Sequence, residues 1–154
     1  MTSASLTRAN ILALAVPSVL MAGALGSQYI GGLYPCEMCY WQRWPHEAAI
    51  AMPILAFFLQ PPARIILIIL AAVAVIVSGG IGIFHAGVEY GWWEGLTTCS
   101  NTALGGSLAD IMSAPLVRCD VAQWTFGGIS LAGYNALFSI LGGVTILGLV
   151  RRAA

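Results

Sequence analysis

The sequence is poor in charge and contains no lysine. Only 8% of its 154 residues are charged, against about a quarter in an ordinary soluble domain, whereas 59% are hydrophobic. This balance excludes a water-soluble globule and indicates a protein that is solvated by lipid. The six basic residues are all arginines, scattered singly except for one terminal pair, so no basic stripe could follow a nucleic-acid backbone. Nucleic acid is therefore excluded as a partner.

Four apolar stretches are predicted to be transmembrane helices, at about residues 10–33, 44–59, 65–85 and 131–150. A helix needs about 20 residues to cross the hydrocarbon core. The second stretch is near the lower limit, which flanking tryptophans at headgroup level and local thinning of the bilayer would ease. We therefore expect an all-α membrane protein, a four-helix transmembrane bundle that forms a single domain over residues 1–154.

The first apolar stretch has an alternative interpretation. Arg8, the apolar run from Ile11 and the small residues 22–24 are also typical of a cleavable signal peptide. The apolar character continues to Ile30, whereas the apolar core of a signal peptide would be shorter. A retained first helix is therefore favoured.

The distribution of charge predicts the orientation in the membrane. Arg8, Arg64 and the arginine pair at 151–152 lie at ends assigned to one side, and the acidic residues lie on or near the other. Positive charge favours the cytoplasmic side, so both termini are expected to be cytoplasmic. The loops at about 34–43 and 86–130 are then periplasmic and carry all four cysteines: Cys36, Cys39, Cys99 and Cys119. Five tryptophans face the same side and suit an interfacial belt: Trp41, Trp44, Trp92, Trp93 and Trp124.

The second periplasmic loop is predicted to contain a short interfacial helix. Apolar residues recur at helical spacing within it, a capping box precedes them, and Pro115 ends the helix. Such a helix would keep the segment that carries Cys99 and Cys119 near the membrane surface. The apolar positions are Leu108, Ile111, Met112 and Leu116, and the capping box is Ser107 with Asp110.

Cys36-Glu37-Met38-Cys39 is a CxxC motif on the side of the membrane where disulfides persist. Such a motif can lower the pKa of one thiol, and only a thiolate attacks disulfides or donates electrons. Two alternatives are a static disulfide that closes a loop and half of a zinc site. The distal cysteines and the two histidines, His46 and His85, fit no familiar zinc-finger spacing, so no metal is predicted.

Arg43 follows Cys39 by four residues. If the second helix begins near Cys36, Cys39 and Arg43 share one face, and the helix N-terminus and the guanidinium would both stabilise a thiolate. Pro45 offers a different helix start, since proline favours the first turn. Arg43 could instead be a residue whose charged end reaches the membrane interface.

The third apolar stretch ends in a glycine-rich segment before His85. The glycines permit close helix packing or leave a slot for a flat cofactor. His85 lies near the outer end of the helix with Glu89 one turn later, so it is a candidate functional group. The alternative is a solvated histidine at the membrane rim.

In combination these motifs resemble the DsbB family of quinone-dependent disulfide-forming proteins. The likeness rests on Cys36-x-x-Cys39-x-x-x-Arg43, on His85, on the distal pair Cys99 and Cys119, and on the order of four spans. The resemblance implies a bacterial inner-membrane protein that reoxidises a periplasmic DsbA-like partner and passes electrons to ubiquinone or menaquinone. Arg43 and His85 would lie beside the quinone.

The resemblance also implies an order of thiol exchange. The partner would attack Cys99 of a Cys99–Cys119 disulfide, Cys119 would attack Cys36, and Cys39 would be released as a thiolate beside the quinone. The main alternative is a membrane scaffold whose loops are held by two permanent disulfides. A carrier of reducing power across the membrane would need thiols on both faces, whereas all four cysteines are assigned to one side.

Overall fold

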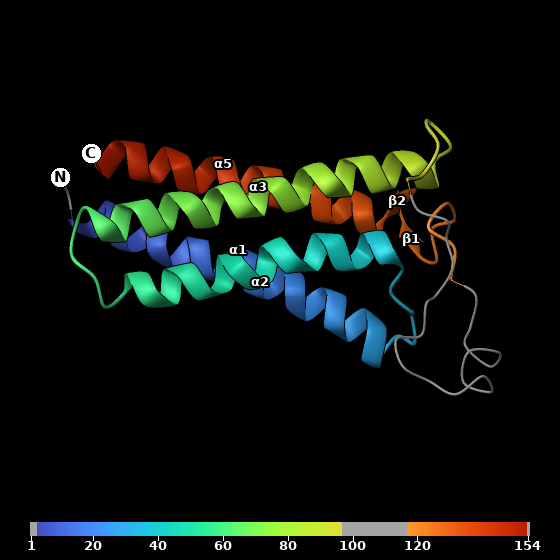
Figure 1. Cartoon of the computed structure of the whole chain (residues 1–154), viewed down its shortest axis with the longest axis horizontal. Helices are drawn as coiled ribbons and strands as arrows, with labels where there is room; N and C mark the ends of the chain where they lie inside the picture. The colour runs from blue at the N-terminus through green and yellow to red at the C-terminus, as the bar shows by residue number, and fades with distance from the viewer. Residues whose placement is uncertain (1–2, 97–116, 154) are drawn as a thin grey trace.

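A computed structural model describes residues 3–96 and 117–153 of the chain. In this part, four helices lie side by side along one long axis: α1 Ser3–Tyr29, α2 Glu37–Ala56, α3 Ala63–Glu89 and α5 Leu131–Ala153 (Figure 1). Both termini and the α2–α3 turn lie at one end, here called the terminal end. The start of α2 and the hairpin lie at the opposite end, here called the cysteine end because Cys36 immediately precedes α2 (Figure 1).

Three helices, α1, α3 and α5, are long and apolar enough to cross a membrane. The chain is therefore a membrane protein built as a helical bundle. α2 has 20 residues, about 30 Å at the usual rise, but Glu37, Arg43 and Glu47 make its first half more polar. That α2 also crosses the membrane remains a prediction.

Two predicted span limits differ from the helices. The stretch predicted at 44–59 is part of a helix that begins at Glu37 and ends at Ala56, because Cys36 caps its first turn. The first helix ends at Tyr29 rather than at residue 33, and Gly32 follows with a φ of 68° that a helix does not allow. The segment between these two helices is therefore residues 30–36, whereas the first loop was predicted at 34–43.

Glycines bring α3 and α5 close together. A Cβ added at Gly79 would lie 2.9 Å from Cδ1 of Ile140, and one added at Gly82 would lie 2.9 Å from the carbonyl oxygen of Ala132. Small residues allow membrane helices to approach in this way. Of the two roles expected for these glycines, close packing is the one that Gly79 and Gly82 serve.

A small hairpin precedes α5 at the cysteine end. Strands β1 Thr125–Phe126 and β2 Ile129–Ser130 pair antiparallel around Gly127 and Gly128, whose φ values are 57° and 80°. Two successive residues with positive φ are typical of a tight hairpin turn, which glycine permits. The hydroxyl of Tyr90 accepts a hydrogen bond from the amide of Ser130 at 2.9 Å and so ties the hairpin to the end of α3.

Two elements within the predicted loop at 86–130 were not predicted from the sequence: the hairpin and the last turn of α3, which ends at Glu89. The predicted interfacial helix lies outside the described residues. Four of the five predicted belt tryptophans, Trp44, Trp92, Trp93 and Trp124, are exposed at the bundle surface. Trp41 instead packs against the apolar cluster around Cys36.

Candidate functional site

The site begins at the first turn of α2. Cys36 is the N-cap residue in an extended conformation, and its Sγ accepts a hydrogen bond from the amide of Cys39 at 3.2 Å. Cys39 thus lies in the first turn, where unpaired amides and the helix dipole favour negative charge. Pro45 lies inside α2, so the alternative in which it starts the helix is wrong.

The two sulfur atoms of the motif share a hydrogen bond. Sγ of Cys36 lies 2.7 Å from Sγ of Cys39, and both cysteines are free thiols here. The hydrogen bond with Cys39, and after it burial, raises the pKa of Cys36. The same hydrogen bond lowers the pKa of Cys39, which lies before the apolar part of α2. These opposite shifts favour a thiolate at Cys39 over one at Cys36.

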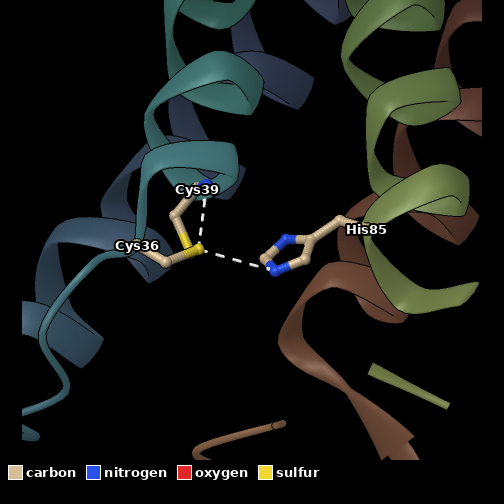
Figure 2. A group of neighbouring side chains, drawn as sticks. All are labelled: Cys36, Cys39 and His85. Atoms are coloured by element: carbon tan, nitrogen blue, oxygen red, sulfur yellow. Dashed lines mark hydrogen bonds between the residues drawn. The ribbon is translucent and has the colours of Figure 1, made fainter. Parts of the chain in front are cut away.

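His85 comes from α3 and points at the cysteine pair (Figure 2). Its Nε2 lies 3.5 Å from Sγ of Cys36 and 3.7 Å from Oε1 of Glu89, and its Nδ1 lies 2.8 Å from Nε2 of Gln42. The imidazole is only 2% exposed, so the alternative of a solvated rim histidine is wrong. Helix α3 thus places a proton carrier against the Cys36 thiol.

Cys36, Cys39 and His85 could also present ligands to a metal, because their ligand atoms lie within 4.8 Å of one another. Two thiolates on one tetrahedral zinc ion lie about 3.8 Å apart, given Zn–S bonds of about 2.3 Å. The observed sulfur separation of 2.7 Å is far shorter. As they lie here, the two sulfur atoms are therefore too close together to bind one zinc ion.

Arg43 reaches from α2 to α1. Its Nη1 donates to Oε1 of Gln28 at 2.6 Å, its Nη2 donates to the carbonyl of Ala24 at 3.0 Å, and its guanidinium lies over the ring of Tyr40. Both hydrogen bonds thus hold α1 against α2. The side chain also lines the pocket beside Cys39, where its positive charge helps to lower the pKa of that thiol.

Of the distal cysteines, Cys119 is described and Cys99 lies outside the described residues. Cys119 is buried in an apolar cluster with Cys36, Met38 and Val88. Its backbone also hydrogen-bonds to His85. The fold therefore brings together a cysteine from each of the two predicted pairs.

A pocket of about 280 Å³ adjoins the cysteine pair, close to the lower end of the usual range of small-molecule sites, about 300–1,000 Å³. Residues of α1 and α5, such as Leu20, Met21 and Phe138, form its apolar walls. Polar and reactive side chains gather on the α2, α3 and α5 sides: Cys36, Cys39, Gln42, Arg43, His46, His85, Glu89 and Asn135.

Sequence reasoning missed a buried polar network that supports the pocket. His46, dismissed as a zinc ligand, is 3% exposed and bonds through Nε2 to Asn135 at 2.9 Å, and Asn135 in turn bonds to Gln42. A usable signal was present, because polar residues four apart, such as Gln42 and His46, interrupt otherwise apolar helices. The remaining members are Ser78 and Ser139.

Most of the chain matches a known protein family. Residues 7–149 match the family described as Disulfide bond formation protein DsbB. The chain belongs to this family. The Disulfide bond formation protein B of Marinobacter nauticus is 30% identical over 146 residues, which cover 84% of this chain and 82% of the relative.

A second relative, an uncharacterized protein of Rickettsia prowazekii, is 24% identical over 138 residues, which cover 85% of this chain and 80% of the relative. No solved structure gives a significant match. Membership in the DsbB family and the long apolar helices together make this chain a membrane protein of disulfide bond formation.

Proposed function

We propose that this protein is a protein dithiol:quinone oxidoreductase that reoxidises a periplasmic DsbA-like partner and so generates disulfides de novo. One observation carries the proposal: a cysteine pair whose sulfur atoms lie 2.7 Å apart, with Cys36 buried and Cys39 half-buried, adjoins a pocket with apolar walls. A static disulfide needs neither a pocket nor a thiolate. A redox-active pair needs both, because only the thiolate passes on electrons.

The pocket suits ubiquinone or menaquinone, whose rings are flat and apolar but carry two oxygen atoms. Apolar side chains of α1 and α5 would hold the ring, and the polar side chains opposite would meet its oxygens. Arg43 and His85 both line the pocket and are proposed to lie beside the ring. When bound, the quinone supplies an acceptor for two electrons and two protons.

The proposed exchange begins with disulfides at Cys99–Cys119 and Cys36–Cys39. A partner thiolate attacks Cys99, the Cys99–Cys119 bond breaks, and the released Cys119 thiolate attacks Cys36 and frees Cys39. The second partner thiol then closes the partner's disulfide and releases Cys99. Attack of Cys99 on Cys119 restores the distal disulfide and leaves Cys36 and Cys39 reduced, so two electrons have moved.

Two structural features support this order. Cys119 and Cys36 share one buried cluster, which suits direct exchange between them. In the reduced pair, the lowered pKa of Cys39 favours a thiolate at this residue, and Cys39 lines the pocket. His85, which contacts Cys36, would take the proton from Cys36 when the disulfide re-forms.

The single domain is proposed to lie in the bacterial inner membrane with both termini in the cytoplasm. Its arginines at positions 8, 64, 151 and 152 all belong to the terminal end of the bundle. After reduction, a membrane-impermeant thiol reagent should label the cysteines from the periplasmic side. Labelling from the cytoplasmic side alone would contradict the proposed orientation.

The deciding experiment supplies the purified protein with a reduced thioredoxin-fold dithiol partner and a short-chain quinone. Absorbance of the quinone should fall in step with formation of the partner disulfide, in a ratio of one to one. Cys39→Ser should abolish both changes. Two results together would instead identify a scaffold. In one, the protein keeps both disulfides when the reduced partner is added without quinone, and in the other, it reduces no quinone when quinone is supplied.

A further inference from the structure

A continuous hydrogen-bonded chain leads from the cysteine pair into the middle of the bundle. It runs from Cys36 to His85 at 3.5 Å, from His85 to Gln42 at 2.8 Å, from Gln42 to Asn135 at 2.9 Å, and from Asn135 to His46 at 2.9 Å. The donors and acceptors along this chain can be assigned one after another, because backbone carbonyls anchor it. The assignment ends on His46.

The first anchor is the carbonyl of Met38, which can only accept. The side-chain amide of Gln42 donates to this carbonyl at 3.1 Å, so the atom that faces Met38 is the nitrogen Nε2. The second hydrogen on Nε2 of Gln42 is donated to Nδ1 of His85. The other amide atom of Gln42, Oε1, accepts from Nδ2 of Asn135. The remaining amide atom of Asn135, Oδ1, must therefore accept from Nε2 of His46.

A second anchor gives the same answer independently. The hydroxyl of Ser78 donates its only hydrogen to the carbonyl of Gln42 at 2.7 Å, so toward Nε2 of His46, 3.0 Å away, its oxygen can only accept. Both anchors place a hydrogen on Nε2 of His46. Among the described residues no acidic side chain pairs with this buried ring, so the ring is neutral and Nδ1 carries a lone pair.

That lone pair has no partner. Nδ1 of His46 is buried and makes no hydrogen bond to the residues that the structure describes, although the ring lines the pocket beside Cys39. Buried polar atoms are nearly always paired, so an orphaned acceptor on a ring that lines a pocket points to a ligand that brings a donor. The two oxygens of a quinone can only accept, whereas the hydroxyls of a hydroquinone donate.

We propose that Nδ1 of His46 accepts a hydrogen bond from a ring hydroxyl of the hydroquinone, and that the pocket thereby prefers the reduced form over the oxidised form. The inference rests on the proposed function. Preferential binding of the reduced form makes the bound quinone a stronger oxidant of the dithiol. A tenfold preference corresponds to about 30 mV for a two-electron couple.

Two substitutions of His46 distinguish the roles of its two ring nitrogens. His46→Gln keeps a donor near the position of Nε2, and with it the bond to Asn135, but leaves no acceptor near Nδ1. His46→Asn places a polar atom near Nδ1 and gives up the donor at Nε2. Gln is therefore the test variant and Asn its matched control.

Binding of a short-chain quinone and of its hydroquinone is measured by calorimetry on the full chain, with both cysteines of the motif changed to serine so that no electrons move. We expect His46→Gln to weaken hydroquinone binding about tenfold while quinone binding stays within about twofold, the loss of one hydrogen bond. His46→Asn should retain part of the preference. Equal losses for both forms, or no loss, would overturn the proposal.

A second measurement is made on the wild-type protein, and the His46→Gln variant serves only to assign the signals. The chain has only two histidines, so ¹⁵N-labelled histidine gives four ring resonances that can be assigned with the His46→Gln variant. Hydroquinone should shift the Nδ1 signal of His46, and quinone should leave it in place. A wild-type protein that binds neither compound would overturn the proposed function as well as this inference, whereas binding without selectivity would overturn the inference alone.

Discussion

The two halves of the bundle are built from different residues. The core of the terminal half is aliphatic, and most of its fully buried positions are alanine: Leu6, Ala9, Ala13, Ala49, Ala56, Ile68, Ala71, Ala72, Val75, Ile146, Val150 and Ala153. The cysteine half buries Gln42, His46, Ser78, His85 and Ser139 instead. The terminal half holds the helices together, and the cysteine half contains the candidate functional site.

The difference teaches how a small membrane bundle supports a polar site. In lipid, helices associate through close packing of small residues, which the terminal half supplies. Buried polar groups cost free energy unless they are paired, and in the cysteine half nearly every one has a partner on another helix. Asn10 is an exception to both rules: it is a polar residue buried in the terminal half, and its amide makes no hydrogen bond to a described residue.

The largest effect is expected at Cys39. Replacing it with serine removes the thiolate, so electron transfer should fall to background, whereas serine can keep a hydrogen bond to Cys36 and the fold should survive. Quinone reduction and thermal unfolding in detergent measure the two properties. Gly148→Ala, in the open part of the terminal half, should leave both unchanged. If Cys39→Ser retained turnover, the reaction would not depend on the cysteine pair in the cysteine half.

A second substitution tests packing in the terminal half. A Cβ at Gly143 would overlap Cγ1 of Ile76 and would lie 3.0 Å from the carbonyl oxygen of Ala72, so Gly143→Ala should destabilise the bundle by about 1–3 kcal/mol. Gly148→Ala is the matched control on the same helix, because nothing lies within 4 Å of its added Cβ. Unfolding in detergent compares them. Equal stabilities would contradict close α3–α5 packing as the source of stability.

The pH dependence of thiol reactivity sharpens the account of the cysteine half. Because the hydrogen bond from Cys36 lowers the pKa of Cys39, its thiolate persists to lower pH than an ordinary cysteine thiolate. Alkylation of Cys39 in the reduced protein, followed by peptide mass, should therefore rise at a lower pH than that of a model thiol. Cys36→Ala should move the rise to higher pH, and Cys36→Ser, which keeps a donor, should move it less. Identical profiles in all three proteins would rule out the hydrogen bond with Cys36 as the cause.

The smallest effect is expected at Asn10. Asn10→Leu replaces an unpaired buried amide with an apolar side chain of the same branching, so stability should change by no more than about 1 kcal/mol, in the stabilising direction. Turnover should be unchanged. A large loss of turnover in a well-folded variant would show that the terminal half also takes part in function and would break the comparison between the halves.

The sequence alone predicted most of the helical architecture. Apolar length and scarce charge located α1, α3 and α5 to within a few residues at most ends, because lipid requires long runs of apolar residues whatever the neighbouring helices do. The CxxC motif and its resemblance to the DsbB family identified the family correctly. The hairpin before α5 was missed, although Gly127 and Gly128 are typical of such a turn.

Only the tertiary structure decided which polar groups meet. Cys36 contacts His85 from 49 residues away, and His46 bonds to Asn135 from 89 residues away. These pairings depend on the rotation and axial position of each helix, which are set by how small residues such as Gly79 and Gly82 let α3 and α5 interlock. A linear pattern shows which side chains share a helix face, but the faces that meet are chosen by packing between helices.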